Sequence, residues 1–150
     1  MMIKAMAGGS EYALGPLRSS LGFLTRVIQV QINERLRAKG GMEISPATLS
    51  LLQLLQANTG IRQVDAARLL LIQESNMANL VKTLISRGLI ERRREAGSRG
   101  GLWITEEGER LVAQWSWAAT IDRSCASVLS DAEYQQLMHL LNRIYQASLA

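Results

Sequence analysis

The chain has 150 residues, a net charge of +4 and only two prolines, and 47% of its residues are hydrophobic. A single compact domain with additional helices fits this length, and this composition excludes extended disorder. No apolar run approaches the ~18 residues that span a bilayer, and the N-terminal segment lacks the apolar stretch of a signal peptide. We therefore predict a cytoplasmic protein without a membrane partner.

The N-terminal part predicts a flexible segment, residues 1–16, followed by a long helix over residues 17–40. Pro16 stands where a helix can begin, because proline is tolerated in the first turn. Apolar residues then recur at steps of three and four, as in an amphipathic helix; they are Leu17, Leu21, Leu24, Ile28, Ile32 and Leu36. Gly40 and Gly41 end the pattern.

Residues 45–105 predict a helix-turn-helix with a wing. Ser45 and Pro46 can cap and open a helix that runs to Gly60. A short helix from Arg62 to Leu71 follows, and the side chains expected to face inward are Val64, Ala67 and Leu70. The next helix ends at Gly88 and has an apolar face at helical spacing, made of Met77, Leu80, Val81, Leu84 and Ile85.

Two short strands are predicted directly after Gly88, in the stretches LIERRR and LWIT. A polar tip with Gly97, Gly100 and Gly101 joins them, so the simplest interpretation is a β-hairpin appended to the helix-turn-helix, which is a winged helix. The tip sequence GSRGG is not a nucleotide-binding loop, because it lacks the GxxxxGK[ST] spacing and leads into a strand instead of a helix.

Residues 106–148 predict two closing helices. Thr105 can cap the first, whose apolar stripe is Leu111, Val112, Trp115, Ala119 and Val128. Ser130 and Glu133 form a capping box for the second, whose stripe is Leu137, Leu140, Leu141, Ile144 and Tyr145. A small winged helix cannot cover this apolar surface, so residues 17–40 and 106–148 are interpreted as dimerisation helices. The alternative is that the first and last helices pack on each other within a monomer.

The predicted fold class is therefore mainly α with a small β-hairpin wing: a winged helix-turn-helix with N- and C-terminal dimerisation helices. The distribution of charge also indicates what kind of partner the chain binds. Residues 62–99 contain eight basic and four acidic residues, which accounts for the whole net charge of +4. One basic segment within an otherwise neutral chain is typical of a protein that binds a polyanion. The alternative is a solvated basic face that binds nothing.

Candidate DNA-binding residues lie on the second helix of the motif and on the wing. The exposed side of that helix carries Ser75, Asn76, Asn79, Lys82 and Thr83. Asparagine can read adenine in a major groove, and lysine suits a phosphate. Arg99 at the wing tip can follow the backbone or enter a minor groove, and Arg92 and Arg94 share one strand face. Further backbone contacts are assigned to Arg62, Gln63 and Gln73. The competing interpretation is that all these residues are ordinary solvent-facing side chains.

The sequence predicts no catalytic residue, no metal site and no cofactor, and hence no enzyme. Cys125 is the only cysteine and His139 the only histidine, so neither a nucleophile constellation nor a zinc site can be assembled. His139 is expected to be packed or interfacial. Cys125 is expected to be a buried small residue, with a redox role as the alternative. Trp103, Trp115 and Trp117 are expected to pack, although Trp115 or Trp117 could line a ligand cavity.

From about residue 17 to 148 the chain resembles the multiple-antibiotic-resistance regulator (MarR) family of winged-helix transcription factors. The resemblance is carried by RQVDAARLLLIQESNMANLVKTLISRGLIERR, the basic wing and ITEEGERL, in that order. Three positions depart from the family pattern. Gly97 stands where an aspartate is frequent, Asn79 where many members have arginine, and Leu71 where a small turn residue is frequent.

The resemblance implies a homodimer that binds pseudo-palindromic double-stranded DNA, most often as a repressor. It also implies release from DNA by a small phenolic or anionic effector that enters between the dimerisation helices and the winged helix. The mechanism would be a change in spacing between the two recognition helices. The alternative from another class is a winged helix that serves as a protein–protein interaction module and does not bind DNA.

Overall fold

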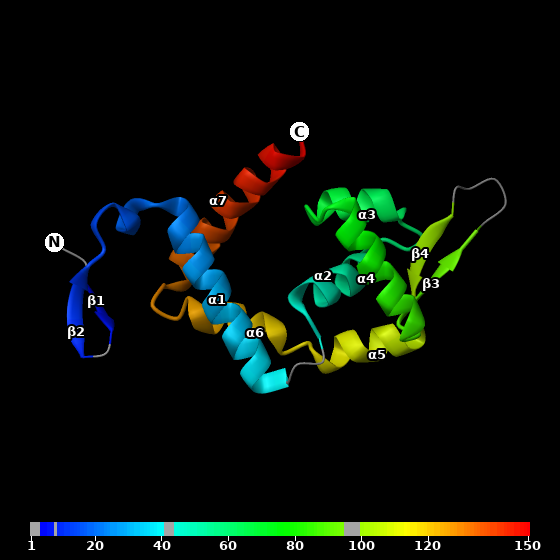
Figure 1. Ribbon diagram of the computed structural model, residues 1–150, viewed down its shortest axis with the longest axis horizontal. Coiled ribbons are helices and arrows are strands. Elements are labelled where there is room, and N and C mark those ends of the chain that lie inside the picture. Colours follow the sequence, from blue (N-terminus) through cyan, green and yellow to red (C-terminus); the bar gives the residue numbers. More distant parts are fainter. Residues whose placement is uncertain (1–3, 8, 41–43, 95–99) are drawn as a thin grey trace.

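The computed structural model describes residues 4–7, 9–40, 44–94 and 100–150. Figure 1 shows two groups of elements, a winged helix at one end and a helical group at the other. The winged helix contains α2 (Pro46–Ala57), α3 (Gln63–Leu69), α4 (Glu74–Ser86), β3 (Ile90–Arg93), β4 (Gly101–Ile104) and α5 (Glu106–Gln114). The helical group contains α1 (Leu21–Gly40), α6 (Ala118–Cys125) and α7 (Asp131–Leu149). The predicted fold class, mainly α with a hairpin wing, is confirmed.

The core of the winged helix forms where the apolar faces of its helices meet the base of the wing. The fully buried side chains are Leu51, Leu52, Leu55, Met77, Val81, Leu84, Ile90 and Leu102. Each buried aliphatic side chain of this size contributes about 1.5–3 kcal/mol relative to an exposed one. This shared core fixes the position of α4 relative to the wing.

Two of the predicted helix caps are present in the winged helix. The hydroxyl of Ser45 accepts a hydrogen bond from the backbone amide of Thr48 at 3.1 Å. The hydroxyl of Thr105 accepts one from the amide of Gly108 at 3.2 Å. A cap of this kind satisfies an amide that the helix itself leaves unpaired, so both helix starts are defined by their sequence.

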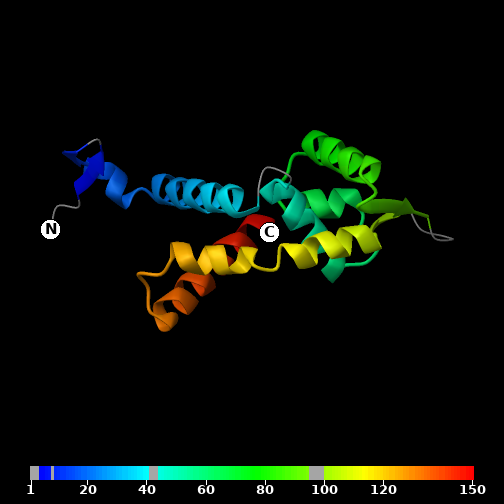
Figure 2. The same cartoon turned by 90° about the horizontal axis from the view of Figure 1, so that it is seen from below.

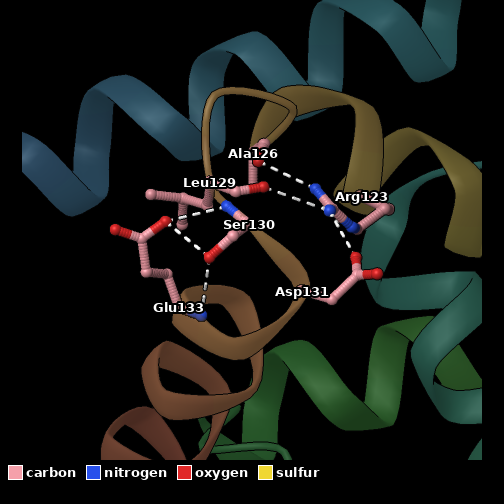
Figure 3. A network of polar contacts seen from close by, with 6 residues as sticks. All are labelled: Arg123, Ala126, Leu129, Ser130, Asp131 and Glu133. Carbon is pink, nitrogen blue, oxygen red and sulfur yellow. Dashed lines mark hydrogen bonds and ion pairs between the residues drawn. The ribbon is translucent and has the colours of Figure 1, made fainter.

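The corner between α6 and α7 is held by polar contacts (Figure 3). The guanidinium of Arg123 donates to the carbonyls of Ala126 and Leu129 and to the carboxylate of Asp131, the last at 2.8 Å. Ser130 and Glu133 form the predicted capping box. One arginine therefore satisfies carbonyls after α6 and neutralises a carboxylate in the first turn of α7.

A small aromatic joint connects the two groups. The sequence predicted one helix after Thr105. In the structure this segment forms two helices, α5 and α6, with a break between Gln114 and Ala118. At the break, the rings of Trp115 and Trp117 stack with centroids 5.0 Å apart. Lys39 lies over the ring of Trp117 at 4.8 Å. Trp115 is buried in a cluster with three further residues, Ile44, Leu49 and Ala118. Figure 2 shows α5 and α6 following one another, with α6 beneath α1.

The N-terminal region has more structure than the sequence indicated. β1 (Lys4–Ala7) and β2 (Ser10–Ala13) pair as an antiparallel hairpin, followed by a 3-10 helix, η1 (Gly15–Ser19). The long helix therefore begins at Leu21, and Pro16 opens η1 instead. Both strands are short and lack a strong apolar alternation, which is why no strand was predicted there.

Several side chains that the sequence placed on apolar faces are exposed. Val64 and Ile85 are 42% and 39% exposed, because each lies at the edge of its helix's buried face. Val128 is 90% exposed in the turn after α6, and Ala119 of the same predicted stripe is exposed on α6. His139, which was expected to be packed or interfacial, is exposed on α7. Cys125 is partly exposed at the end of α6. Within the described residues, no helix is both long and apolar enough to cross a membrane.

Candidate nucleic-acid interface

The exposed face of α4 carries all five polar residues that the sequence assigned to DNA. They are Ser75, Asn76, Asn79, Lys82 and Thr83, and each is exposed. The opposite face is buried through Met77, Val81 and Leu84. Because residues three and four apart are neighbours on a helix, Asn76, Asn79 and Thr83 form one row. The hydroxyl of Thr83 already donates to the carbonyl of Asn79 at 2.9 Å, so Thr83 is left chiefly as an acceptor.

The turn before α4 has a defined geometry with an unusual residue. The amide of Leu71 donates to the carbonyl of Arg68, and the amide of Ile72 donates to the carbonyl of Ala67. This pair of bonds is a Schellman motif, which requires a left-handed residue after the helix end. Leu71 occupies that position with φ 52°, the one non-glycine residue with positive φ among the described residues. The turn that the sequence predicted is therefore formed despite the leucine.

The end of α4 uses the same motif with glycine. The amides of Gly88 and Leu89 donate to the carbonyls of Ile85 and Leu84, and Gly88 has φ 69°. This stop turns the chain directly into β3. The predicted role of Gly88 as the helix stop is confirmed, and it links the orientation of α4 to the position of the wing.

The wing is an antiparallel pair whose arginines have different surroundings. In the register of β3 and β4, Glu91 lies opposite Trp103 and Arg93 opposite Gly101. Arg93 pairs with Glu91 and lies over the ring of Trp103, 5.8 Å from its centroid. Arg92, on the other face, donates to the amide oxygen of Gln63 at 2.6 Å. Strand alternation thus separates Arg92 from Arg93, as predicted.

The other two wing arginines are placed differently. Arg94 is exposed and follows the last residue of β3, so strand alternation no longer fixes its face. Arg99 lies outside the described residues. Among the described wing arginines, Arg92 is held against α3 by the side chain of Gln63.

The base of the wing is anchored to the segment before α3. Ile61 forms an isolated bridge with Leu102, and the amide of Gly60 donates to the Leu102 carbonyl at 3.1 Å. A methyl group on Gly60 would lie 2.7 Å from the Trp103 ring, and one on Gly101 would lie 2.2 Å from the Gly60 carbonyl oxygen. Sequence reasoning missed this bridge, because one bridging residue gives no alternation signal.

The three residues assigned to backbone contacts flank α3 and α4. Arg62 pairs with Asp65 at 2.6 Å. That hydrogen bond lowers the pKa of the Asp65 carboxyl and raises the pKa of the Arg62 guanidinium. Gln63 supports Arg92, and Gln73 is exposed at the start of α4. The side chains of Arg62 and Gln63 therefore already have side-chain partners in the protein.

No group of three or more histidine, cysteine, aspartate or glutamate side chains is arranged to hold a metal ion in the parts of the chain described. The chemistry offered by this face is hydrogen bonding and positive charge. Amide, hydroxyl, ammonium and guanidinium groups, carried on one exposed helix and an adjoining hairpin, suit base edges and phosphates.

Comparisons with known proteins agree with this geometry. The probable transcriptional regulator from Pseudomonas aeruginosa is 25% identical, with a TM-score of 0.76, and the match covers 85% of this chain and 98% of that one. The transcriptional repressor CouR, solved bound to a 23-mer DNA duplex, is 27% identical, with a TM-score of 0.76 and coverage of 90% and 99%. The PcaV transcriptional regulator from Streptomyces coelicolor, solved with its natural ligand, is 23% identical, with a TM-score of 0.78 and coverage of 95% and 99%.

The fold and its neighbours thus define the class: a winged-helix protein with the architecture of transcriptional regulators. A family model described as the MarR family matches residues 43–99, which span α2 to the wing. Over these residues the chain is similar to the MarR family.

Proposed function

We propose that this protein is a homodimeric transcriptional regulator that binds a specific double-stranded DNA site through α4 and the wing. One observation carries the proposal: α4 exposes a continuous polar row, and the hairpin that follows it carries an arginine run. The related repressor CouR was solved bound to a DNA duplex. A major groove is wide enough for one helix, and its base edges distinguish all four base pairs.

The proposed roles follow the chemistry of each side chain. Asn76 and Asn79 contact base edges near the start of α4, where helix-turn-helix proteins make such contacts. Ser75, Thr83 and Lys82 bind adjacent base edges or phosphates. Arg92, Arg94 and Arg99 of the wing neutralise the backbone or enter the minor groove. Backbone contacts at the edge of the site are assigned to Arg62, Gln63 and Gln73.

A second copy of the chain is proposed to cover the apolar surface of α1 and α7. None of the residues of α7 is buried. The large exposed apolar side chains on these two helices are Leu21, Leu24, Ile28, Val30, Met138, Leu140, Leu141 and Ile144. Large apolar side chains exposed along two helices are typical of an association surface. A two-fold dimer would present two α4 helices to successive major grooves.

Repression and release by an effector are proposed from the neighbours. CouR is described as a transcriptional repressor and was also solved bound to p-coumaroyl-CoA. A small phenolic or anionic effector that favours another spacing of the two α4 helices would lower DNA affinity by population shift. The proposed site of action is DNA in the cytoplasm.

The direct test is selection of bound duplexes from a random pool. We expect an enriched site with two-fold symmetry and an affinity that falls steeply with salt, because binding releases counterions from the phosphates. A protein that selects no duplex even at low salt would instead be an interaction module without DNA binding, and the proposal would be abandoned.

Single substitutions separate the proposed roles. Asn79→Ala should reduce the preference for the selected site by about 1–3 kcal/mol while non-specific affinity stays unchanged. Arg94→Ala should weaken all sequences similarly and reduce the salt slope by about one. Arg143→Ala, which removes the same charge from α7, is the matched control and should change neither quantity.

A further inference from the structure

One hydrogen bond joins the last helix to the helix-turn-helix. The hydroxyl of Tyr145 on α7 donates to the backbone carbonyl of Leu69, in the last turn of α3, at 2.7 Å. The two residues are separated by 76 positions in the sequence. Figure 1 shows the C-terminal end of α7 directed toward α3, away from the α6–α7 corner. The bond therefore connects the two groups of elements.

The Leu69 carbonyl is available because of how α3 ends. The last four carbonyls of a helix lack partners within the helix. Here the amides of Leu70, Leu71 and Ile72 reach the carbonyls of Ala66, Arg68 and Ala67, respectively. No backbone amide reaches the Leu69 carbonyl in the hydrogen bonds of the described residues. The Tyr145 hydroxyl satisfies the acceptor that the Schellman motif leaves open.

The acceptor lies at a sensitive point in the fold. Leu69 precedes the turn in which Leu71 adopts a left-handed conformation, and that turn sets where α4 begins. A change at the end of α3 is transmitted to α4, because the two helices share the core formed by Ala66, Ala67 and Met77. α7 has no buried residue, and the bond from Tyr145 is a specific polar contact between α7 and α3.

We propose that Tyr145 is a positioning residue that couples the placement of α7 to the orientation of the recognition helix α4. The inference rests on the proposed function, because it concerns the spacing of two α4 helices on DNA. In a dimer held through α1 and α7, each hydroxyl would fix one α4 relative to the two-fold axis. Rupture of the bond would let that spacing vary.

The test compares Tyr145→Phe with Tyr134→Phe. Both changes remove one hydroxyl from α7 and keep the ring. The Tyr134 ring lies beneath Arg123, and its hydroxyl makes no hydrogen bond among those described. Affinity is measured for the selected duplex and for one whose half-sites are one base pair further apart. We expect Tyr145→Phe to reduce the preference for the selected duplex over the duplex with the longer spacing three- to tenfold. Tyr134→Phe should leave this preference unchanged.

Hydrogen exchange supplies a second readout that needs no DNA. Amides of residues 66–73 should exchange several-fold faster in Tyr145→Phe, while those of the wing strands stay unchanged. The positioning role would be overturned if Tyr145→Phe left the ratio of the two affinities unchanged, including by weakening both equally. Faster exchange throughout the chain would also overturn it. Failure of the natural protein to bind any duplex would defeat the proposed function, and the contact between α7 and α3 would then be judged by the exchange of residues 66–73 alone.

Discussion

The winged helix and the α1–α7 region use different means to hold their structure. Every fully buried large side chain in the described residues lies in the winged helix, whereas α7 has none. The α1–α7 region instead has exposed apolar side chains and a corner held by Arg123, Ser130 and Glu133. The winged helix can therefore be stable on its own packing, whereas the α1–α7 region has polar contacts and exposed apolar side chains that the proposed second copy would cover.

The largest difference should appear when one leucine of the core is truncated. Leu52→Ala removes a fully buried side chain of α2 and should cost about 2–5 kcal/mol, since the cavity adds to the lost transfer free energy. The loss should be independent of protein concentration. Chemical unfolding followed by circular dichroism at two protein concentrations would measure it.

The matched change in the other region is Ile28→Ala, at a residue of α1 that is 48% exposed. We expect this change to raise the concentration at which dimers dissociate, measured by analytical ultracentrifugation, and to have its main effect there. A concentration-independent loss as large as that of Leu52→Ala would mean that α1 packs within the monomer, which contradicts the proposed contrast.

Glycines should also respond differently in the two regions. Gly101→Ala would place a methyl group against the Gly60 carbonyl at the base of the wing and should cost about 1–3 kcal/mol through overpacking. Gly22→Ala meets no atom within 4 Å at the start of α1 and should stabilise the helix by up to about 1 kcal/mol. Thermal unfolding distinguishes the two signs. Destabilisation by both alanines would remove the contrast.

Local sequence signals predicted much of the winged helix and the start of α7. Ser45, Thr105 and Ser130 act as the caps that their positions indicated, and the buried face of α4 followed its periodicity. These features depend on neighbours a few residues apart, so a single sequence contains them. The polar residues of α4 are exposed as expected, while their role on DNA remains a prediction.

What the sequence missed depends on distant partners. The bridge of Ile61 to Leu102 and the bond of Tyr145 to Leu69 join segments far apart in the chain. The break at Trp115–Trp117 follows from packing in the aromatic joint, although the apolar stripe continues through it. Periodicity reports which side of an element is apolar, and it does not report which element meets that side.

The winged helix also contains one strained residue, and its removal should be favourable. Leu71 and Gly88 occupy the same position of two Schellman motifs. A side chain in the left-handed region costs about 1–2 kcal/mol, and Leu71 is 61% exposed, so little burial compensates. Leu71→Gly should be more stable than Leu71→Ala by about 1 kcal/mol in urea unfolding. Gly88→Ala should lower the free energy of unfolding by a similar amount. Equal stability of the glycine and alanine variants at position 71 would show that no strain is stored there.

The smallest expected effect concerns the pH dependence of the α6–α7 corner. Hydrogen bonds from the backbone amide and hydroxyl of Ser130 lower the pKa of Glu133 below its ordinary value of 4.5. The ionised carboxylate therefore stabilises the folded chain above that value, and the stabilisation is lost as the pH falls through the lowered pKa.

Glutamine can still accept the bond in a capping box but does not titrate. Glu133→Gln should thus show a smaller decrease in thermal midpoint between pH 7 and about pH 3 than the natural chain. Glu34→Gln, which removes an exposed carboxylate of α1, should show the full decrease. The same pH dependence in all three proteins would mean that the ionised carboxylate of Glu133 contributes nothing to the stability of the α6–α7 corner.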